Sequence, residues 1–429
     1  MTPLKIGIAG LGTVGAGTVR LLAENAPLIA ARAGRPIRVT AVSARDKSRD
    51  RGIALAGITW HDNAISLATD PNVDVVVELI GGSDGPAKAL VEAAIAAGRP
   101  VVTANKALLA VHGAAIAAAA EAASLPLGFE AAVAGGIPVI KVLREGLAAN
   151  RVSRVAGILN GTCNYILTTM REEGRDFPEV LASAQALGYA EADPAFDIDG
   201  VDAAHKLTIL TALAFGQNVD FSAVHIEGIR HISALDISFA EELGYRIKLL
   251  GIAQQTPAGV SMRVHPAMVP VSKLLAAVEG VFNAVLMEGD FSGPVFCQGR
   301  GAGAGPTASA VVADLIDIAR GNKIPVWGAA QSALAPSRPV AISALTGAYY
   351  LRLMVTDQPG VLADVTAILR EHGISLESML QHGRKPGEAV PIVLVTHDTM
   401  EAAISAAIAR IARLECVQEP PALIRIEPK

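Results

Sequence analysis

The sequence predicts an α/β protein that begins with a doubly wound parallel sheet, continues with an α+β region and ends in a smaller α+β domain. Three observations carry this prediction. Apolar strands alternate with helical segments over residues 1–130, a glycine-rich turn follows the first strand, and residues 348–429 have the order strand, helix, strand, strand, helix, strand. A chain of 429 residues is also too long for one hydrophobic core, so several domains are expected.

Composition and charge exclude several classes of protein. Hydrophobic residues make up 51% of the chain, which is too many for a disordered protein. A net charge of -5 gives no reason to expect nucleic acid as a partner, and no apolar run is long enough to span a membrane. The cysteines, Cys163, Cys297 and Cys416, show no disulfide or metal-ligand spacing, and a strand starts almost directly after Met1. We therefore expect a soluble, cytoplasmic protein without a signal peptide.

The first apolar run, Leu4–Ala9, leads into the motif G-x-G-x-x-G, and a helical pattern follows over 18–34. In such a turn the first glycine allows the tight bend, the second lets a pyrophosphate approach the backbone, and the third lets helix and strand pack closely. Free N–H groups at the helix N-terminus then bind the phosphates. The sequence therefore predicts a Rossmann-type dinucleotide-binding domain whose cofactor contacts Gly10, Leu11, Gly12, Thr13, Val14 and Gly15.

The second strand, Ile37–Ser43, ends without the acidic residue that would bind the ribose 2′-hydroxyl of NAD. Arg45 follows instead, with Lys47 and Arg49 nearby, and a guanidinium suits a 2′-phosphate. NADP is therefore favoured over NAD as the cofactor, although Asp46 weakens this preference. The alternative is a solvated basic loop that contacts no cofactor.

Two later segments are expected to face the cofactor. Lys106 follows the strand Pro100–Thr103, and ligands of open α/β sheets lie at the carboxyl ends of the strands. Lys106 should therefore point at the nicotinamide, unless it only caps the strand. Gly303 lies in the glycine run 299–305, which either brings N–H groups to a ligand or acts as a hinge. We expect the helix after it, 306–320, to return to the N-terminal domain.

A candidate cation site follows the strand predicted over Leu127–Ala132. The turn 133–138 contains two glycines and a proline, and it lies near Glu130. One carboxylate with several unpaired carbonyl groups is an oxygen-only set that suits a hard cation. From these residues alone, an ordinary strand-to-helix turn explains the pattern better.

The stretch 187–206, LGYAEADPAFDIDGVDAAHK, is the strongest candidate for a substrate site. Five carboxylates lie between Glu191 and Asp202, and the helix that follows is apolar enough to be buried. Asp202 and Lys206 are four residues apart and share one helix face. A surface ion pair is the ordinary explanation of this spacing. Charged side chains at the point where a polar loop leads into a buried helix are costly, however, unless they bind a ligand. The cluster suits a small cationic substrate and a proton transfer.

The C-terminal part of the chain is expected to fold separately. Residues 321–347 form a linker rich in Pro, Ser and Ala, and residues 348–429 read as a ferredoxin-like domain of its own. No catalytic constellation is visible in that domain.

Taken together, the motifs of the chain resemble those of the homoserine dehydrogenase family, and the C-terminal segment resembles an ACT domain. The resemblance covers nearly the whole chain and implies the monofunctional form, without an aspartate-kinase segment. It implies a nucleotide-binding domain over 1–130, a substrate-binding, catalytic and dimerisation domain over 131–320, and an ACT regulatory domain over 348–429. The motifs are GLGTVG at 10–15, TANKALLA at 103–110, NGTCNYIL at 160–167, LGYAEADPAFDIDGVDAAHK at 187–206, GRGAGAGPTASAV at 299–311 and DQPGVLADVTAIL at 357–369.

The resemblance also implies a reaction, the reversible NAD(P)-dependent reduction of L-aspartate 4-semialdehyde to L-homoserine in threonine, methionine and isoleucine biosynthesis. Lys206 matches the proposed acid/base of the family, and Asp202 matches its partner near the reacting oxygen. Lys106 corresponds to a second lysine near cofactor and substrate, and Glu191 to the ligand of the substrate ammonium group. Gly161, Thr162 and Asp197 complete the expected substrate site.

Further partners follow from the same resemblance. A sodium ion would bind Glu130 and the carbonyl groups of Val133, Gly135 and Ile137. Members of the family are usually homodimers or homotetramers. An ACT domain commonly binds an amino acid, here threonine as the end product of the pathway.

Two other classes of function remain open from the sequence. A thiol-dependent semialdehyde dehydrogenase would use Cys163 as its nucleophile, but the NGTC motif offers no histidine as a base. A non-catalytic amino-acid sensor would keep the dinucleotide fold without the reaction.

Overall fold

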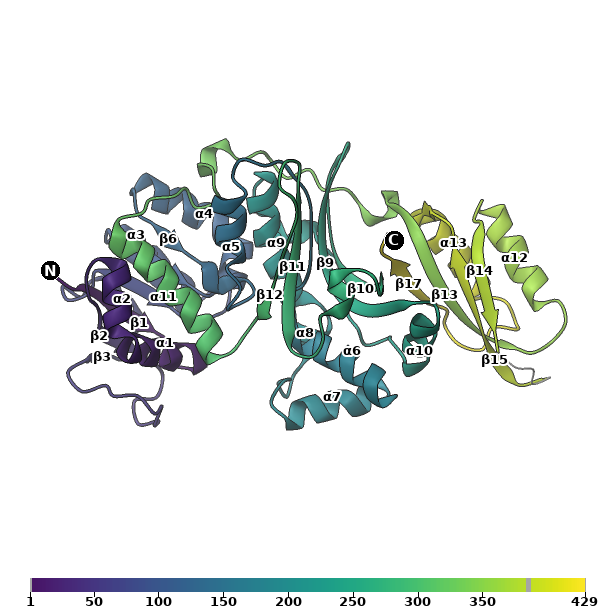
Figure 1. Ribbon diagram of the computed structural model, residues 1–429, viewed down its shortest axis with the longest axis horizontal. Coiled ribbons are helices and arrows are strands. Elements are labelled where there is room, and N and C mark those ends of the chain that lie inside the picture. The colour runs from purple at the N-terminus through teal and green to yellow at the C-terminus, as the bar shows by residue number, and fades with distance from the viewer. Residues whose placement is uncertain (1, 383–386, 429) are drawn as a thin grey trace.

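A computed structural model describes residues 2–382 and 387–428 of the chain. Figure 1 shows three units along the longest axis of the molecule: a sheet with its helices at the N-terminal end, a larger sheet in the middle and the C-terminal unit at the opposite end. Within the described ranges, no helix combines the length and apolarity that crossing a bilayer requires.

The N-terminal unit is built on a six-stranded, fully parallel sheet with the order β3-β2-β1-β4-β5-β6. The predicted doubly wound sheet is confirmed, and its strand order reverses between β1 and β4, where ligands of such sheets bind. The strands are β1 (Leu4–Ala9), β2 (Ile37–Ser43), β3 (Thr59–His61), β4 (Val75–Glu78), β5 (Val101–Thr103) and β6 (Leu127–Gly128).

The helices of this unit differ from the sequence expectation in one place. The pattern over 18–34 forms two helices and not one, because the chain turns at Asn25 and Pro27 opens the next helix, where its missing N–H costs nothing. The predicted strand Leu127–Ala132 is also shorter than expected, since a 3-10 turn, Glu130–Ala132, replaces its second half. The helices are α1 (Thr13–Glu24), α2 (Ala26–Ala33), α3 (Pro86–Ala96) and α4 (Lys106–Ala122).

Helix α11 (Ala304–Arg320) lies against the N-terminal unit although most of the chain separates the two in sequence (Figure 1). A Cβ atom at Gly17 in α1 would lie 2.7 Å from the carbonyl oxygen of Ala304, so the two helices touch through their backbones. The buried side chains of α11, such as Val311 and Leu315, belong to the same core as β1 and β2.

The middle unit packs helices onto a larger sheet. Helix α9 contacts β7, β9 and β10, and its side chains are almost all buried in the main hydrophobic core. The elements that matter for the site are β7 (Val152–Ile158), α6 (Gly161–Glu173), α7 (Phe177–Ala186), α8 (Ala195–Ile198), α9 (Val201–Phe215), β8 (His225–Ile226), α10 (Ala234–Glu242), β9 (Tyr245–Thr256), β10 (Gly259–Pro270), β11 (Phe282–Gly289) and β12 (Gly293–Arg300).

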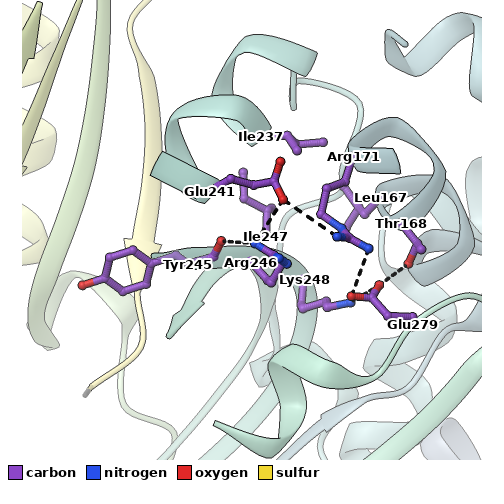
Figure 2. A pocket seen from close by; sticks show the side chains of 10 residues that line it. All are labelled: Leu167, Thr168, Arg171, Ile237, Glu241, Tyr245, Arg246, Ile247, Lys248 and Glu279. Atoms are coloured by element: carbon purple, nitrogen blue, oxygen red, sulfur yellow. Dashed lines mark hydrogen bonds and ion pairs between the residues drawn. The ribbon is translucent and has the colours of Figure 1, made fainter. Parts of the chain in front are cut away.

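A buried charged cluster fixes α6 to this sheet (Figure 2). The ammonium group of Lys248, in β9, donates to the carbonyl of Val278 (2.6 Å) and to the Asn164 side chain in α6 (3.2 Å). Glu279 accepts from Lys248 (3.1 Å) and from Thr168 (2.8 Å). Every charge of the cluster therefore has a partner, and the N-terminus of α6 is held in place for the site described below.

The C-terminal unit has the predicted ferredoxin-like order, and its sheet runs β17-β13-β15-β14 with two helices on one face. Its elements are β13 (Thr346–Thr356), α12 (Val361–Glu371), β14 (Leu376–Gln381), β15 (Ala389–Thr396), β16 (Thr399–Met400), α13 (Glu401–Ile411) and β17 (Ala422–Ile426).

This unit has a hydrophobic core of its own and is also joined to the middle unit. Strand β17 pairs in parallel with β10, so one sheet continues through both units. Asp236 in α10 is fully buried and accepts two hydrogen bonds from Arg352 (2.7 and 3.1 Å) and one from Tyr350 (3.0 Å), both in β13. Arg425 in β17 binds Glu227 in the middle unit and Glu401 in its own. Backbone pairing and buried charges thus join the two units.

Candidate active site

Asp202 lies between two lysine side chains in the first turn of α9. Its Oδ2 is 2.6 Å from Nζ of Lys206, one helical turn further along, and its Oδ1 is 2.9 Å from Nζ of Lys106, the first residue of α4. The Asp202 side chain is 4% exposed. Burial opposes its ionisation, but the charges of Lys206 and Lys106 outweigh burial and hold the pKa of Asp202 far below its ordinary range. The carboxylate is therefore ionised throughout the physiological pH range.

The end of β7 completes this cluster. The carbonyl of Leu159 accepts a hydrogen bond from Nζ of Lys206 at 2.7 Å. The side-chain amide of Asn160 donates to Asp202 (2.8 Å) and to Asp197 (2.8 Å), which links both carboxylates through one group. An ammonium group has three N–H donors, and in the described part of the chain only Leu159 and Asp202 accept from Lys206. One N–H of Lys206 is left for a ligand.

The N-terminus of α6 lies beside the cluster because Asn160 also caps this helix. Its Oδ1 accepts from the backbone N–H of Cys163 at 2.8 Å. The Thr162 hydroxyl lies 2.8 Å from the carbonyl of Tyr189 and 3.2 Å from the Asp197 carboxylate. A Cβ atom at Gly161 would lie 2.8 Å from the carbonyl of Val281, so only glycine fits there. The structure thus brings Gly161, Thr162 and Asp197 together with Asp202 and Lys206.

Cys163 is not available as a nucleophile. Its side chain is fully buried, and its thiol donates to the carbonyl of Asp197 at 3.2 Å. Burial and then the charge of Asp197 raise the pKa of the Cys163 thiol well above its ordinary value. The thiolate that covalent catalysis requires is therefore disfavoured, which argues against the thiol-dependent alternative.

Glu191 lies in the same segment but outside the bonded cluster. It is exposed on the loop before α8, where its backbone carbonyl accepts from the Gln185 side chain at 3.0 Å. Across the described residues, no side chain forms a hydrogen bond or ion pair with its carboxylate. The group is free to take a cationic ligand.

Aromatic rings support Lys106 from one side. Its Nζ lies 5.7 Å from the centre of the Phe196 ring, close enough for a cation–π contact. Phe196 stacks on His205 (5.6 Å between centroids), which in turn stacks on Phe221 (4.2 Å). Burial lowers the pKa of His205, so the ring acts as a neutral support and not as a third cation.

A polar network places the start of α4. The buried carboxylate of Glu78, at the end of β4, accepts from the N–H groups of Ile80 (2.7 Å) and Gly81 (3.0 Å) and from the Thr103 hydroxyl (2.5 Å). The Thr103 hydroxyl accepts from the N–H of Asn105 at 3.0 Å, and Asn105 caps α4. Lys106 therefore stands at the carboxyl end of β5 on a fixed helix terminus, as its sequence position predicts.

The glycine-rich turn has the geometry that dinucleotide binding needs. A Cβ atom at Gly10 (φ 94°) would lie 2.4 Å from the carbonyl oxygen of Leu79, and one at Gly15 would lie 2.0 Å from that of Gly10. At Gly12 no atom lies within 4 Å of such a Cβ atom, so the backbone is open for a phosphate. Leu11 is buried, and Thr13 and Val14 open α1. Gly303 (φ 112°) caps α11, whose first turn adjoins α1.

The basic loop after β2 contacts the glycine-rich turn through Arg51. Arg45 is exposed, whereas Arg51 contacts the glycine-rich turn through the carbonyl of Leu11 (3.1 Å). Arg51 and Lys47 both lie over the Trp60 ring, 5.6 and 6.0 Å from its centre. No feature of the sequence predicted this contact of Arg51 with the glycine-rich turn.

The predicted cation site contains a buried carboxylate. Glu130 is 2% exposed, and its two oxygens accept from the N–H groups of Ile140 (2.9 Å) and Lys141 (3.0 Å). Burial, followed by the charge of Asp314, raises the pKa of Glu130 to about 8. Ala134 (φ 54°), beside Val133 in the same turn, has a left-handed conformation that non-glycine residues rarely adopt. Among the described residues, no cluster of three or more His, Cys, Asp or Glu side chains is arranged to hold a metal ion.

Comparisons with known proteins agree over the whole chain. Residues 138–316 match the family model described as homoserine dehydrogenase, residues 10–130 match the homoserine dehydrogenase NAD-binding domain, and residues 349–416 match the ACT domain. A homoserine dehydrogenase of Pseudomonas aeruginosa is 50% identical over 434 residues, with 100% of this chain and 99% of that protein covered. One of Neisseria gonorrhoeae is 48% identical over 433 residues, with 100% and 99% covered.

Solved structures give the same result. The crystal structure of a homoserine dehydrogenase from Thiobacillus denitrificans is 49% identical, with a TM-score of 0.94 and 100% of this chain and 99% of that chain covered. A hyperthermophilic archaeal homoserine dehydrogenase in complex with NADPH is 26% identical, with a TM-score of 0.63 and 74% of this chain and 97% of that chain covered. The chain belongs to the homoserine dehydrogenase family, with an ACT domain at its C-terminal end, and is an NAD(P)-dependent oxidoreductase that acts on a CH–OH group.

Proposed function

We propose that Lys206 is the acid/base of the reversible reduction of L-aspartate 4-semialdehyde to L-homoserine. The observation that carries this proposal is the position of Lys206, whose ammonium group is held by Asp202 and Leu159 and keeps one N–H for a ligand. Such a group can donate a proton to the aldehyde oxygen as negative charge develops there. Asp202 orients Lys206 through their 2.6 Å contact, and Lys106 adds a second positive charge next to the same carboxylate.

The remaining substrate contacts follow from the same cluster. Glu191 binds the substrate ammonium group. This role is supported by its carboxylate, which forms no hydrogen bond or ion pair with a residue that the structure describes. Asp197, Gly161 and Thr162 form the wall at the start of α6. We assign these roles to residues 131–320 and cofactor binding to residues 1–130 together with α11, with 321–347 as the connection to the ACT domain.

The cofactor is proposed to be NADP, held by the turn Gly10–Gly15, with Lys106 and the Gly303 turn beside it. A bound nicotinamide supplies or accepts the hydride. Arg45 is exposed and forms no hydrogen bond or ion pair with any residue that the structure describes, which supports contact with a 2′-phosphate. The archaeal relative in complex with NADPH also supports this choice. NAD remains the second candidate for the same turn.

A sodium ion is proposed at Glu130 and the carbonyl groups of Val133, Gly135 and Ile137. The donor set fits, since it consists of one carboxylate and neutral oxygens, which suits a hard cation. A cation would compensate the burial that raises the pKa of Glu130 to about 8. The left-handed backbone at Ala134 and Gly135 turns this segment sharply, which is the kind of strain that proteins keep at ligand sites.

Regulation by threonine is proposed through the ACT domain. Its Asp357–Gly360 turn leads into α12, whose first N–H groups suit an amino-acid carboxylate. A homodimer or homotetramer is supported by large apolar side chains that are exposed near the ends of β10 and β11, such as Phe291 at 91% and Leu274 at 60%. The free cysteines support a reducing cytoplasm as the working compartment.

Replacement of Lys206 by alanine tests the catalytic assignment. Loss of a positioned acid/base typically lowers the rate by about 10²–10⁴-fold, so kcat for L-homoserine should fall by that factor while the affinity for NADP, measured by fluorescence titration, stays unchanged. Lys88→Ala is the matched control, because Lys88 forms an exposed i,i+4 pair with Glu92 at 2.6 Å. A fall of kcat of less than about tenfold would leave Lys206 with a structural role only.

A further inference from the structure

Arg51 connects the two segments that are expected to hold two different parts of the cofactor. Its Nε donates to the carbonyl of Leu11 in the glycine-rich turn at 3.1 Å. Its terminal nitrogens donate to the carbonyl groups of Arg49 (2.7 Å) and Asp46, both in the loop after β2. Leu11 and Arg51 are 40 residues apart in the chain. One planar guanidinium therefore binds the turn and the loop at the same time, in a fixed geometry that a lysine ammonium group does not have.

The ring of Trp60, in β3, supports this guanidinium from one side. The central carbon of the Arg51 guanidinium lies 5.6 Å from the centre of the ring, and Trp60 packs against the core of the N-terminal unit. The Nε1 of Trp60 donates to the Asp62 carboxylate at 3.1 Å, which fixes the orientation of the ring. The half-buried side chain of Arg51 is thus held against the fold and does not extend freely into solvent.

The loop that Arg51 binds is also ordered by its own side chains. The carboxylate of Asp46 accepts from the backbone N–H of Ser48 (2.9 Å) and from its hydroxyl (2.6 Å), and these hydrogen bonds lower the pKa of Asp46. The Asp50 carboxylate accepts from the N–H of Gly52 at 2.9 Å. Asp46, the acidic residue that weakens the preference for NADP, is therefore turned toward its own loop. Arg45 stands exposed in the same loop.

The hydrogen bonds of Arg51 indicate what this residue does. A guanidinium has five N–H donors, of which one belongs to Nε and two to each terminal nitrogen. The Nε donor is used by the turn, and each terminal nitrogen already binds the loop. Within residues 2–382 and 387–428, the partners of Arg51 are carbonyl groups and the Trp60 ring, and no carboxylate forms an ion pair with it. This arrangement fits a residue that joins two segments better than one that waits for a phosphate.

We propose that Arg51 is a positioning residue for the cofactor, which holds the basic loop against the glycine-rich turn before the cofactor binds. The turn is assigned to the pyrophosphate and Arg45 to the 2′-phosphate, so this inference rests on the proposed NADP site. Two segments that already have the correct spacing lose less conformational freedom on binding, which raises the affinity. Arg51 acts through the backbone of both segments. Its effect therefore extends to NAD, which lacks the 2′-phosphate but shares the pyrophosphate.

Fluorescence titrations of the full-length protein with NADPH and NADH test the proposal. Arg51→Met should weaken the binding of both by similar factors, about fivefold or more, because the loop and the turn lose their shared hydrogen bonds. Arg51→Lys keeps the charge but not the planar group, so it should show nearly the same loss, and it serves if the methionine variant does not fold. The matched control is Arg38→Met, an exposed arginine near the start of β2, which should change either affinity less than about twofold.

A double-mutant cycle with Arg45→Ala gives a readout that a general loss of stability would not change. If Arg51 positions the loop that carries Arg45, the Arg45→Ala loss for NADPH should be smaller in the Arg51→Met background, by about twofold or more. With NADH the same cycle should show no coupling, because that cofactor has no 2′-phosphate for Arg45 to bind.

Three outcomes would overturn the proposal. A loss that is confined to NADPH and restored in Arg51→Lys would make Arg51 a direct ligand of the 2′-phosphate. Unchanged affinity for both cofactors in Arg51→Met would mean that the loop keeps its place without Arg51. Additive losses in the double mutant would show that Arg45 and Arg51 act independently. Equal losses of NADPH and NADH in Arg45→Ala alone would refute the proposed 2′-phosphate contact, and the NADH titration of Arg51→Met would still decide the role of Arg51.

Discussion

Removal of the guanidinium of Arg352 should destabilise the protein strongly, because it leaves a buried carboxylate without its main partner. Arg352 donates two hydrogen bonds to Asp236, whose side chain is fully buried, while its own side chain is 8% exposed. Breaking one partner of a buried ion pair typically costs about 3–5 kcal/mol. For Arg352→Met, the hydrogen-bond donors left to Asp236 within residues 2–382 and 387–428 would be Ser233 and Tyr350.

The cost converts into a measurable shift of the melting temperature. At about 2.1 cal/mol/K per residue, a chain of 429 residues gains roughly 0.9 kcal/mol/K on unfolding. A loss of about 3–5 kcal/mol should therefore lower Tm by roughly 3–6 °C, measured by calorimetry. The control is Arg410→Met, which removes an exposed pair with Glu371 (side chains 47% and 51% exposed) and should change Tm much less, because solvent screens the pair.

The effect should also depend on pH. Burial raises the pKa of the Asp236 carboxyl group in the folded protein. The hydrogen bonds and charge of Arg352 outweigh burial, so the pKa of Asp236 is lowered. The wild-type pair thus stabilises the fold above the unfolded pKa and loses this contribution as pH falls through the folded pKa. Without Arg352, burial raises the pKa of Asp236, so the difference between variant and wild type should shrink from about pH 7.5 to about pH 5. A shift equal to that of Arg410→Met at both pH values would refute this reasoning.

Three further predictions concern the catalytic unit. Glu191→Gln should raise KM for L-homoserine more than it lowers kcat, because it removes binding shared by ground and transition states; an unchanged KM would assign the ammonium group to Asp197. Arg45→Ala should weaken NADP binding about tenfold or more and leave NAD almost untouched; equal losses in titrations with both cofactors would make Arg45 a loop residue. Cys163→Ala should keep kcat within about threefold of the wild type, since the thiol is buried and protonated; a near-complete loss of rate in the same assay would revive the thiol mechanism.

Local patterns allowed the fold class and part of the site to be predicted. The glycine-rich turn and the spacing of Asp202 and Lys206 are properties of a few neighbouring residues, and the structure has both as expected. The break between α1 and α2 was missed although Pro27 marks it, because the apolar pattern continues on both sides.

Contacts between distant segments could not be predicted in this way. Asn160 acts on Asp202 only because β7 ends against α9, 42 residues further along the chain. An asparagine before a helix predicts an N-terminal cap, and Asn160 does cap α6. This local pattern does not predict that the amide group of Asn160 also binds two carboxylates. The pairing of β17 with β10 could not be predicted either, because the sequence of an edge strand does not indicate which strand will pair with it.

The return of α11 to the N-terminal unit has a consequence for movement. The chain crosses between this unit and the middle unit three times, at 130–138, at 300–304 and at 321–335, and the first two crossings lie side by side. The N–H of Gly136 donates to the carbonyl of Arg300 at 3.1 Å, and a Cβ atom at Gly135 would lie 2.5 Å from the carbonyl oxygen of Gly301. We expect these two adjacent crossings to act as a hinge about which the units rotate, while the third connection follows the rotation.

That hinge joins two halves of the catalytic cluster. Lys106 belongs to the N-terminal unit and Asp202 to the other, with 2.9 Å between their charged atoms. A rotation that separates the units breaks this ion pair and leaves Asp202 with Lys206 and Asn160. A rotation that opens the site for product release would therefore also break the contact that organises proton transfer.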